Sequence, residues 1–508
     1  MQWLFAIIMF VWPGSSAGDS SVVATVAGLV ITQRDLLDSF EAGPAFVRRQ
    51  ENPLRKHLEY MINERLLTKL ADSLGYSQSD FVKERLSALE EDLAVDELYK
   101  AEILSRVRLK ERDVAENMQK ARMNVRYRWI YAQTKDGVET LWSKTEKGHS
   151  FDSLFQRELE GEVTLSNRSA ETTLLKLERD NPDLAASLVK LRSGQISRAL
   201  EGNDGYYIVR VDDLWQNPLS TQTEQTSLRE EAIKVGKEIH ANALATLYVR
   251  NKMKQADPVL KAEGFNILRA YLAEKGLSHE TRIKWSIPAT FMTEAGPQPI
   301  SASAKFLNRT LVSFGKEALA VRDYVRWFDI RQFQLKTHSL AAFNSSIKRT
   351  VWKMVQDRLL VEEAYSRGLQ LGDTIRHESK KWAAKLLYLA GRAYVLRSAT
   401  IEEEMLVTMY GQRKNRYRDS AGNMRPYDQV KESIRAEALN EQETTVLFRT
   451  LQALKKAYPV SINDNRVDQL SATVKKDPGA IDVMFYKPGG TFPRVAFPTI
   501  DEAWSRMQ

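Results

Sequence analysis

The sequence predicts an α+β protein of several domains, with two mainly helical lobes that arise from an internal duplication and one α/β domain inserted in the first lobe. Two observations predict this architecture. Amphipathic helical patterns recur 293 residues apart, and within the first copy Leu184–Val211 is typical of a helix followed by a β-hairpin. With 508 residues, 43% hydrophobic and 28% charged, the chain can bury several hydrophobic cores.

The amino-terminal segment has the composition of an export signal. An apolar run from Trp3 to Trp12 is followed by Pro13, Gly14 and small residues up to Ala17. We therefore expect a signal peptide over residues 1–17, cleaved after Ala17, and a periplasmic protein. No Lys or Arg precedes the apolar run, so a retained amino-terminal anchor stays open as the alternative.

Cysteine content and charge limit the chemistry. The chain has no cysteine, which excludes disulfides, thiolate catalysis and Cys-ligated zinc. The formal net charge of +8 has two interpretations. It can be an ordinary soluble basic surface, or it can attract acidic polypeptides and an anionic membrane surface.

The first lobe begins at residues 18–122. Val22–Ile31 alternates like a strand with a turn at Gly28, and Thr32 is placed to cap the following helix, which carries Asp35 in its first turn. Further helices are expected where apolar residues recur at helical spacing, with Gly75 as a carboxyl-terminal cap. They cover Gln33–Phe40, Leu58–Leu70, Phe81–Ile103 and Glu111–Arg122.

The duplication rests on an alignment at constant offset. Met61–Leu67 aligns with Met354–Leu360, and at the same offset Ala71 pairs with Ala364 and Gly75 with Gly368, so the apolar face and the helix stop both recur. The second lobe is predicted over residues 312–463. It lacks an inserted domain and has a helix at Ile401–Gln412, a basic loop over residues 413–426 and a long return helix at Tyr427–Ala457.

The remaining segments connect or follow these lobes. Residues 222–278 are predicted to supply the return helices of the first lobe, which dock back onto its first helices. Residues 279–311 are rich in Pro, Gly, Ser and Thr and predict a linker. Residues 464–508 carry several Pro and Gly residues and predict an extended arm or a small β-element rather than a helix.

The inserted domain is predicted over residues 123–215, with a strand at Val125–Tyr131, a helix at Glu139–Lys147 and a second helix that begins at Phe151. Its last part resembles the closing segment of parvulin-type (PpiC-type) peptidyl-prolyl isomerase domains. The resemblance is carried by Gly-Gln-Ile-Ser at 194–197 and Gly-Tyr-Tyr-Ile at 205–208, where the family usually has Gly-Glu-Ile-Ser and Gly-Tyr-His-Ile. The family's Gly-Asp-Leu-Gly segment is absent where Glu162–Ser169 stands.

The whole arrangement resembles the SurA and PpiD type of periplasmic chaperone, in which a helical domain is interrupted by an isomerase domain. The resemblance implies an ATP-independent holdase that binds unfolded outer-membrane or secreted polypeptides and has outer-membrane assembly or secretion machinery as a further partner. Two other functions stay open. One is an active peptidyl-prolyl isomerase that uses Tyr207 and a recruited polar group, and the other is a structural subunit of an envelope or secretion assembly.

The resemblance also implies where catalysis would reside. Parvulins place one histidine on the first strand and one on the last, and here these positions hold Trp129 and Tyr207. Neither side chain offers the switchable donor and acceptor of an imidazole, so we expect a degenerate site with little or no isomerase activity. The candidates for contacting a peptide are Trp129, Phe151, Phe155, Tyr206 and Tyr207, with ordinary core packing as the alternative. His149 is expected to be a solvent-facing loop residue.

Other signatures are missing. No Walker loop occurs, and His377-Glu378 begins like a zinc-protease helix but Lys381 stands where the second histidine must be. The basic cluster Arg413–Arg418 contains Tyr417, and for an exported protein a solvated loop or a contact to acidic clients or lipid is favoured over nucleic acid. We therefore expect no metal, nucleotide or other cofactor and no nucleic-acid partner.

Overall fold

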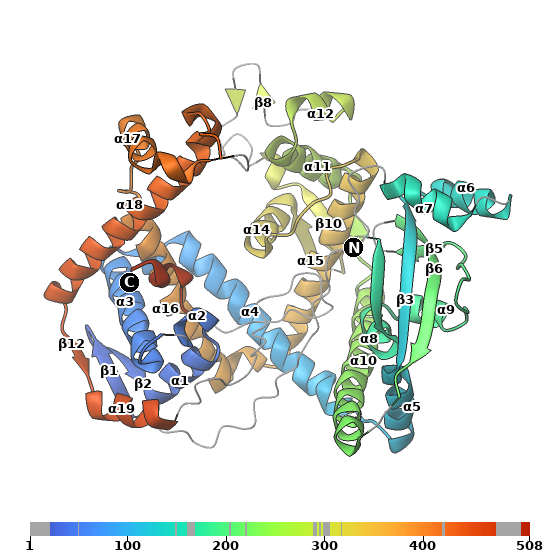
Figure 1. Cartoon of the computed structure of the whole chain (residues 1–508), viewed down its shortest axis with the longest axis horizontal. Coiled ribbons are helices and arrows are strands. Elements are labelled where there is room, and N and C mark those ends of the chain that lie inside the picture. The colour runs from blue at the N-terminus through green and yellow to red at the C-terminus, as the bar shows by residue number, and fades with distance from the viewer. Residues whose placement is uncertain are drawn as a thin grey trace. The chain divides into compact units, whose positions relative to one another are not determined.

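The computed structural model describes residues 21–48, 50–147, 150–159, 168–202, 205–218, 221–287, 292–293, 296–297, 305–315, 317–418, 422–473 and 499–507. These residues form two compact units, which are described separately. The central unit comprises residues 95–367, and the terminal unit comprises residues 21–94 together with 368–473 and 499–507. The chain is thus an α+β protein of more than one unit (Figure 1). The expected signal peptide over residues 1–17 lies outside the described residues.

The terminal unit begins with a β-hairpin, as the sequence predicts. Strands β1 (Val22–Val26) and β2 (Leu29–Thr32) are joined at Ala27 and Gly28, whose φ angles of 49° and 84° are those of a type I′ turn. The third strand of this sheet is β12 (Val460–Ile462), which pairs antiparallel with β1 so that Ala24 faces Ile462. Residues more than 400 positions apart therefore build one sheet.

Helices from both ends of the chain cover this sheet in the terminal unit (Figure 1). The oxygen Oγ1 of Thr32 accepts a hydrogen bond from the Asp35 N–H at 3.1 Å, which confirms the predicted cap of the first helix. Helices α3 and α16 pack closely, and α18 adds Leu447, Leu451 and Leu454 to the same core. The helices of this unit are α1 (Gln33–Glu41), α2 (Ala45–Arg48), α3 (Pro53–Ser73), η1 (Tyr76–Gln78), η4 (Leu369–Leu371), α16 (Asp373–Leu396), α17 (Glu403–Arg413), η5 (Lys414–Arg416), α18 (Tyr427–Ala457), α19 (Asp464–Thr473) and η6 (Glu502–Met507).

The central unit contains the predicted α/β domain. Its four strands lie in the order β4-β3-β6-β5, and all neighbours are antiparallel. The elements of this domain are β3 (Met123–Ala132), α6 (Lys135–Glu146), α7 (Phe151–Leu159), β4 (Ser169–Thr173), α8 (Leu174–Asp180), α9 (Pro182–Leu188), β5 (Leu200–Gly202) and β6 (Gly205–Gln216). The first strand of the hairpin predicted within Leu184–Val211 is short: Ile196 forms a single bridge to Arg210, and β5 begins only at Leu200.

A second three-stranded sheet completes the central unit. The hairpin of β10 and β11 pairs with β7, which follows the long helix α10, in the order β11-β10-β7. Helices α5 and α10 pack so closely that a Cβ at Gly236 would lie 2.1 Å from the Asn117 amide nitrogen. The elements are α5 (Glu111–Arg122), α10 (Gln222–Ala256), β7 (Val259–Leu260), α11 (Ala262–Gly276), α12 (His279–Lys284), β8 (Met292–Thr293), β9 (Gly296–Pro297), β10 (Thr310–Phe314), β11 (Glu317–Ala320), α14 (Val321–Arg331) and α15 (Leu340–Ser366).

The grouping of these elements differs from the two consecutive lobes expected from the sequence. Residues 222–278 are expected to dock onto the first helices, yet their strand β7 pairs with β10. The strand β12 at the end of the second lobe pairs with β1 instead. Helix α4 (Asp80–Glu102) and the η2 turn (Leu104–Arg106) follow η1, and because α4 continues unbroken past Ala94, the chain leaves the terminal unit along it.

The prediction of a tail without helix is wrong at its start. Helix α19 occupies residues 464–473, capped by the Asn463 side-chain oxygen, which accepts from the Arg466 N–H at 3.2 Å. Val467 and Leu470 are buried in the terminal core and stabilise this helix from one face. Residues 474–498, which hold all the Pro and Gly residues of this tail, lie outside the described residues.

Candidate functional site

Trp129 and Tyr207, at the two positions where the resemblance would place histidines, lie on one face of the sheet β4-β3-β6-β5. Strands β3 and β6 pair so that Tyr131 faces Tyr207 and Trp129 faces Val209. Because side chains alternate along a strand, Trp129 and Tyr207 point to the same side, toward α8 and α9. Trp129 is therefore part of the core on this side, and Tyr207 packs against that core.

Trp129 is a packing residue rather than an exposed contact. Its side chain is 3% exposed and belongs to a core with Leu188 and Val209, and its ring centroid lies 5.7 Å from that of Tyr127. The indole Nε1 is buried without a hydrogen-bond partner in the described structure. Burial, followed by the charge of Asp180, raises the pKa of Tyr127 to about 12, so the phenol beside the indole favours its neutral form even more than usual.

Tyr207 lies at the more open end of the same face. It is half-buried, and its ring stands 5.4 Å from that of Tyr131, which in turn receives the Arg168 guanidinium at 5.3 Å from the ring centroid. A phenol and an indole in these positions supply no imidazole pair. The histidine between residues 123 and 216 is His149, which lies outside the described residues, so its expected loop position stays a prediction.

The other three candidates lie on the opposite face of the sheet. Phe151 and Phe155 of α7 stack with centroids 5.9 Å apart and are 6% and 0% exposed, and half-buried Tyr206 packs beside their core. The five candidates therefore belong to two cores separated by the sheet, and they do not form one continuous surface.

An ion-pair cluster that the sequence patterns above did not predict covers the Phe151 and Phe155 rings. Arg128 binds Asp212 through two hydrogen bonds of 2.6 and 2.8 Å and Asp152 at 3.0 Å, while Arg210 binds the other Asp152 oxygen. The Arg128 guanidinium lies 4.9 Å from the Phe155 centroid. The alternation of Arg and Asp on facing strands was the available signal.

The electrostatics of this cluster favour the charged forms of Arg128 and Asp152. Hydrogen bonding to Asp212 raises the pKa of Arg128 despite its partial burial. Burial alone would raise the pKa of Asp152, but the hydrogen bonds and charges of Arg210 and Arg128 outweigh it and hold that pKa below its ordinary value. With all its charges paired, the cluster stabilises α7 on the sheet and offers no free acid or base for catalysis.

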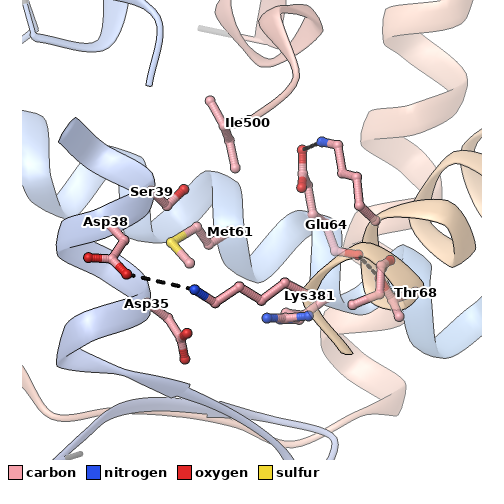
Figure 2. Close-up of a pocket in the computed structure, with 11 residues that line it drawn as sticks. Asp35, Asp38, Ser39, Met61, Glu64, Thr68, Lys381 and Ile500 are labelled. Atoms are coloured by element: carbon pink, nitrogen blue, oxygen red, sulfur yellow. Dashed lines mark hydrogen bonds and ion pairs between the residues drawn. The ribbon is translucent and has the colours of Figure 1, made fainter. Parts of the chain in front are cut away.

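A second candidate site is a small cavity in the terminal unit, between α1, α3 and α16 (Figure 2). Its volume of about 70 Å³ is far below that of a pocket for a drug-sized ligand. Figure 2 shows Lys381 of α16 extending toward Asp38 of α1, with Nζ 3.7 Å from Oδ2. Beside it Lys385 lies 2.6 Å from Glu64. These charges are mutually paired, so the cavity holds a structural ion-pair network.

The described part of the chain shows no metal centre. No group of three or more potential ligands among its His, Asp and Glu residues is placed to hold a metal ion. Among the described helices, none has the length and apolar character needed to cross a membrane.

No family model matches the chain, and no curated protein matches it either. Solved structures to which it is similar include a peptidylprolyl isomerase, PrsA, of Bacillus cereus, at 14% identity and TM-score 0.21, over 45% of this chain and 93% of that one. PrsA of Bacillus subtilis is 18% identical at TM-score 0.17, over 48% and 96%. A structure from Campylobacter jejuni described among SurA-like chaperones is 14% identical at TM-score 0.12, over 46% and 96%. Because these TM-scores lie below 0.5, the function proposed next rests on this chain's own residues.

Proposed function

We propose that the chain is an ATP-independent chaperone that holds unfolded polypeptides outside the cytoplasm, with a parvulin-like domain that does not catalyse prolyl isomerisation. The proposed location follows from the apolar segment Trp3–Trp12 and the small residues after it. The proposed clients are outer-membrane or secreted polypeptides, and contact with assembly machinery or with a membrane surface is part of the same proposal.

The observation that carries the holdase proposal is the exposure of large apolar side chains along α16, α17 and α18. Val407 is 53% exposed and Phe448 is 52% exposed, although a core lies directly beneath both helices. Scattered apolar contacts of this kind bind with low affinity and low sequence specificity. Because the affinity is low, a client can dissociate without nucleotide hydrolysis. The six exposed side chains are Leu389, Tyr394, Met405, Val407, Leu439 and Phe448.

The holdase proposal is tested by aggregation of an unfolded β-barrel protein, with the Val407→Ser, Phe448→Ser double variant beside the wild type. We expect the variant to need several-fold more chain for half-maximal protection. Leu371→Ser is the matched control, because Leu371 is 69% exposed in the same unit but lies outside the three helices. Equal protection by wild type and double variant would show that these side chains do not hold clients.

The proposal of an inactive parvulin-like domain is supported by Trp129, which fills the first histidine position with a buried indole. An active site needs an apolar seat for proline together with polar groups suited to the twisted amide, and the barrier to be lowered is about 20 kcal/mol. The full chain is mixed with a proline-containing peptide, and the rate of cis–trans exchange is followed. We expect the uncatalysed rate at micromolar chain, and clear acceleration would refute the proposal.

We also propose that the two helical lobes are copies of one ancestral unit whose second halves have been exchanged. Each copy has a hairpin with the same bulge, between Val22 and Ala24 and between Thr310 and Val312. In each copy a glycine with positive φ precedes a 3-10 helix, at Gly75 and Gly368. Each hairpin then takes its third strand from the other copy, which accounts for the pairing of β1 with β12 and β10 with β7.

A further inference from the structure

The end of the chain folds into the terminal unit as a short, separate segment. Residues 499–507, called the carboxyl segment here, contain η6 and insert two apolar side chains four positions apart. Ile500 is 4% exposed and Trp504 is 0% exposed, and both join the core formed by α3, α16 and α18. The Trp504 ring lies 6.0 Å from that of Tyr388.

Polar contacts fix the register of the carboxyl segment on α3 and α16. The Asp501 N–H donates to the Glu64 carboxylate at 2.9 Å, and the Tyr388 hydroxyl donates to the Asp501 carboxylate at 2.6 Å. Arg392 lies 3.4 Å from the same Asp501 oxygen. Burial alone would raise the pKa of Asp501, but these hydrogen bonds and positive charges hold it below its ordinary value. The surface of α3, α16 and α18 that holds this segment, called the groove here, thus contacts a carboxylate that lies between an aliphatic and an aromatic side chain.

The walls of this groove keep their own charge partners without the carboxyl segment. Glu64 is paired with Lys385 at 2.6 Å, and Arg392 is within 3.9 Å of Glu443. The small cavity is lined by Met61 of α3 and by Ile500 of the carboxyl segment (Figure 2). Release of the carboxyl segment would therefore enlarge this cavity. Since no buried charge would be left unpaired, release of the segment exposes apolar surface without the large cost of breaking a buried ion pair.

We propose that this groove is a polypeptide-binding site that the chain fills with its own carboxyl segment, and that an unfolded client displaces the segment. The partner is a client stretch with a branched aliphatic residue, a carboxylate next to it and a tryptophan four positions after the aliphatic residue, as in Ile500, Asp501 and Trp504. This inference rests on the proposed holdase function. It adds a specific site and an internal competitor to the exposed helices described above.

The test joins the carboxyl segment to the groove by a covalent bridge. The chain has no cysteine, so Asn440→Cys and Arg506→Cys introduce the only thiols, at two residues that are hydrogen-bonded to each other. A short bis-thiol-reactive linker then closes the groove in the folded protein. Each sample is titrated with a fluorescent peptide of the sequence of residues 499–507, and its protection of an unfolded β-barrel protein is measured.

We expect the bridged sample to bind the peptide at least tenfold more weakly than the unbridged sample, and to protect the client less. Trp504→Ala in the full chain should bind the peptide at least tenfold more tightly, with Ser505→Ala, an exposed neighbour, as the control. Equal peptide binding with and without the bridge, or none in either sample, overturns the proposed site. Undiminished protection by the bridged sample overturns the client assignment and leaves the holdase intact. Absence of protection in both samples refutes the holdase itself, together with the client assignment.

Discussion

His57 gives the most quantitative prediction about stability. Its imidazole is fully buried on α3, its Nε2 lies 2.8 Å from the Ser39 hydroxyl, and its ring packs edge-on against Phe40 at 5.5 Å. Burial, with a smaller contribution from the charge of Arg48, lowers the pKa of His57 to about 3. The folded protein therefore keeps this histidine neutral at pH values where an unfolded chain protonates it.

The sign and size of the pH effect follow from this difference. Stability is fully present above the unfolded pKa of about 6.5, and it falls as the pH drops toward the folded pKa, because the unfolded chain then binds the extra proton. Between pH 7 and pH 5 the loss from His57 alone is about 2 kcal/mol. This figure depends little on the folded pKa, since a value near 3 leaves the folded imidazole neutral at pH 5.

The assay is urea unfolding at pH 7, 6 and 5. Unfolding is monitored by hydrogen exchange of the α3 amides, so that the signal reports the terminal unit. His57→Gln cannot titrate, so the variant should lose about 2 kcal/mol less than the wild type on going to pH 5. Ser39→Ala is the control, because it removes a hydrogen bond worth roughly 1 kcal/mol at every pH and leaves the pH dependence in place. Identical pH dependences for His57→Gln and wild type would refute the burial argument.

Further predictions concern helix packing and the core around Trp129. A Cβ at Gly391 would lie 2.4 Å from the Leu67 carbonyl oxygen where α16 crosses α3, so Gly391→Ala should destabilise the chain by roughly 1–3 kcal/mol in urea unfolding. Gly411 of α17 is the control, because a Cβ there would meet no atom, and Gly411→Ala should stabilise the folded chain by about 0.5–1 kcal/mol. Equal changes in stability for Gly391→Ala and Gly411→Ala would contradict the close crossing of α16 and α3. Trp129→Ala should lower the free energy of unfolding by about 3–5 kcal/mol, because the indole is buried. The folded variant should still protect clients as the wild type does. Unchanged stability would contradict the burial of the indole.

The sequence predicted most elements because each carries a local signal. The caps and stops at Thr32, Gly75 and Gly368 lie where the sequence placed them, and α5 and α18 have the predicted bounds.

The association of these elements could not be predicted in the same way. An apolar face shows that a helix is buried but not which partner buries it. The pairing of β12 with β1 and of β7 with β10 therefore left no periodic signal in the sequence. A weak local signal existed, because Pro258 and Pro459 each precede a valine that begins a strand directly after a long helix. Equally, Ile500 and Trp504 at helical spacing indicated that the end of the chain has a buried face.

The relative positions of the candidate peptide-binding residues could not be predicted from local sequence patterns either. Aromatic residues close in sequence, such as Tyr206 and Tyr207, point to opposite faces because they are consecutive on one strand. The Arg128 and Asp212 pair joins residues 84 positions apart, and only the strand register brings them together.

The central claim is that this chain holds unfolded polypeptides without nucleotide, and aggregation of an unfolded outer-membrane β-barrel protein tests it most directly. The client is diluted from urea into buffer without ATP, alone or with an equimolar amount of the full chain, and light scattering is recorded. We expect the equimolar chain to suppress most of the scattering. Scattering equal to that of the client alone would contradict it.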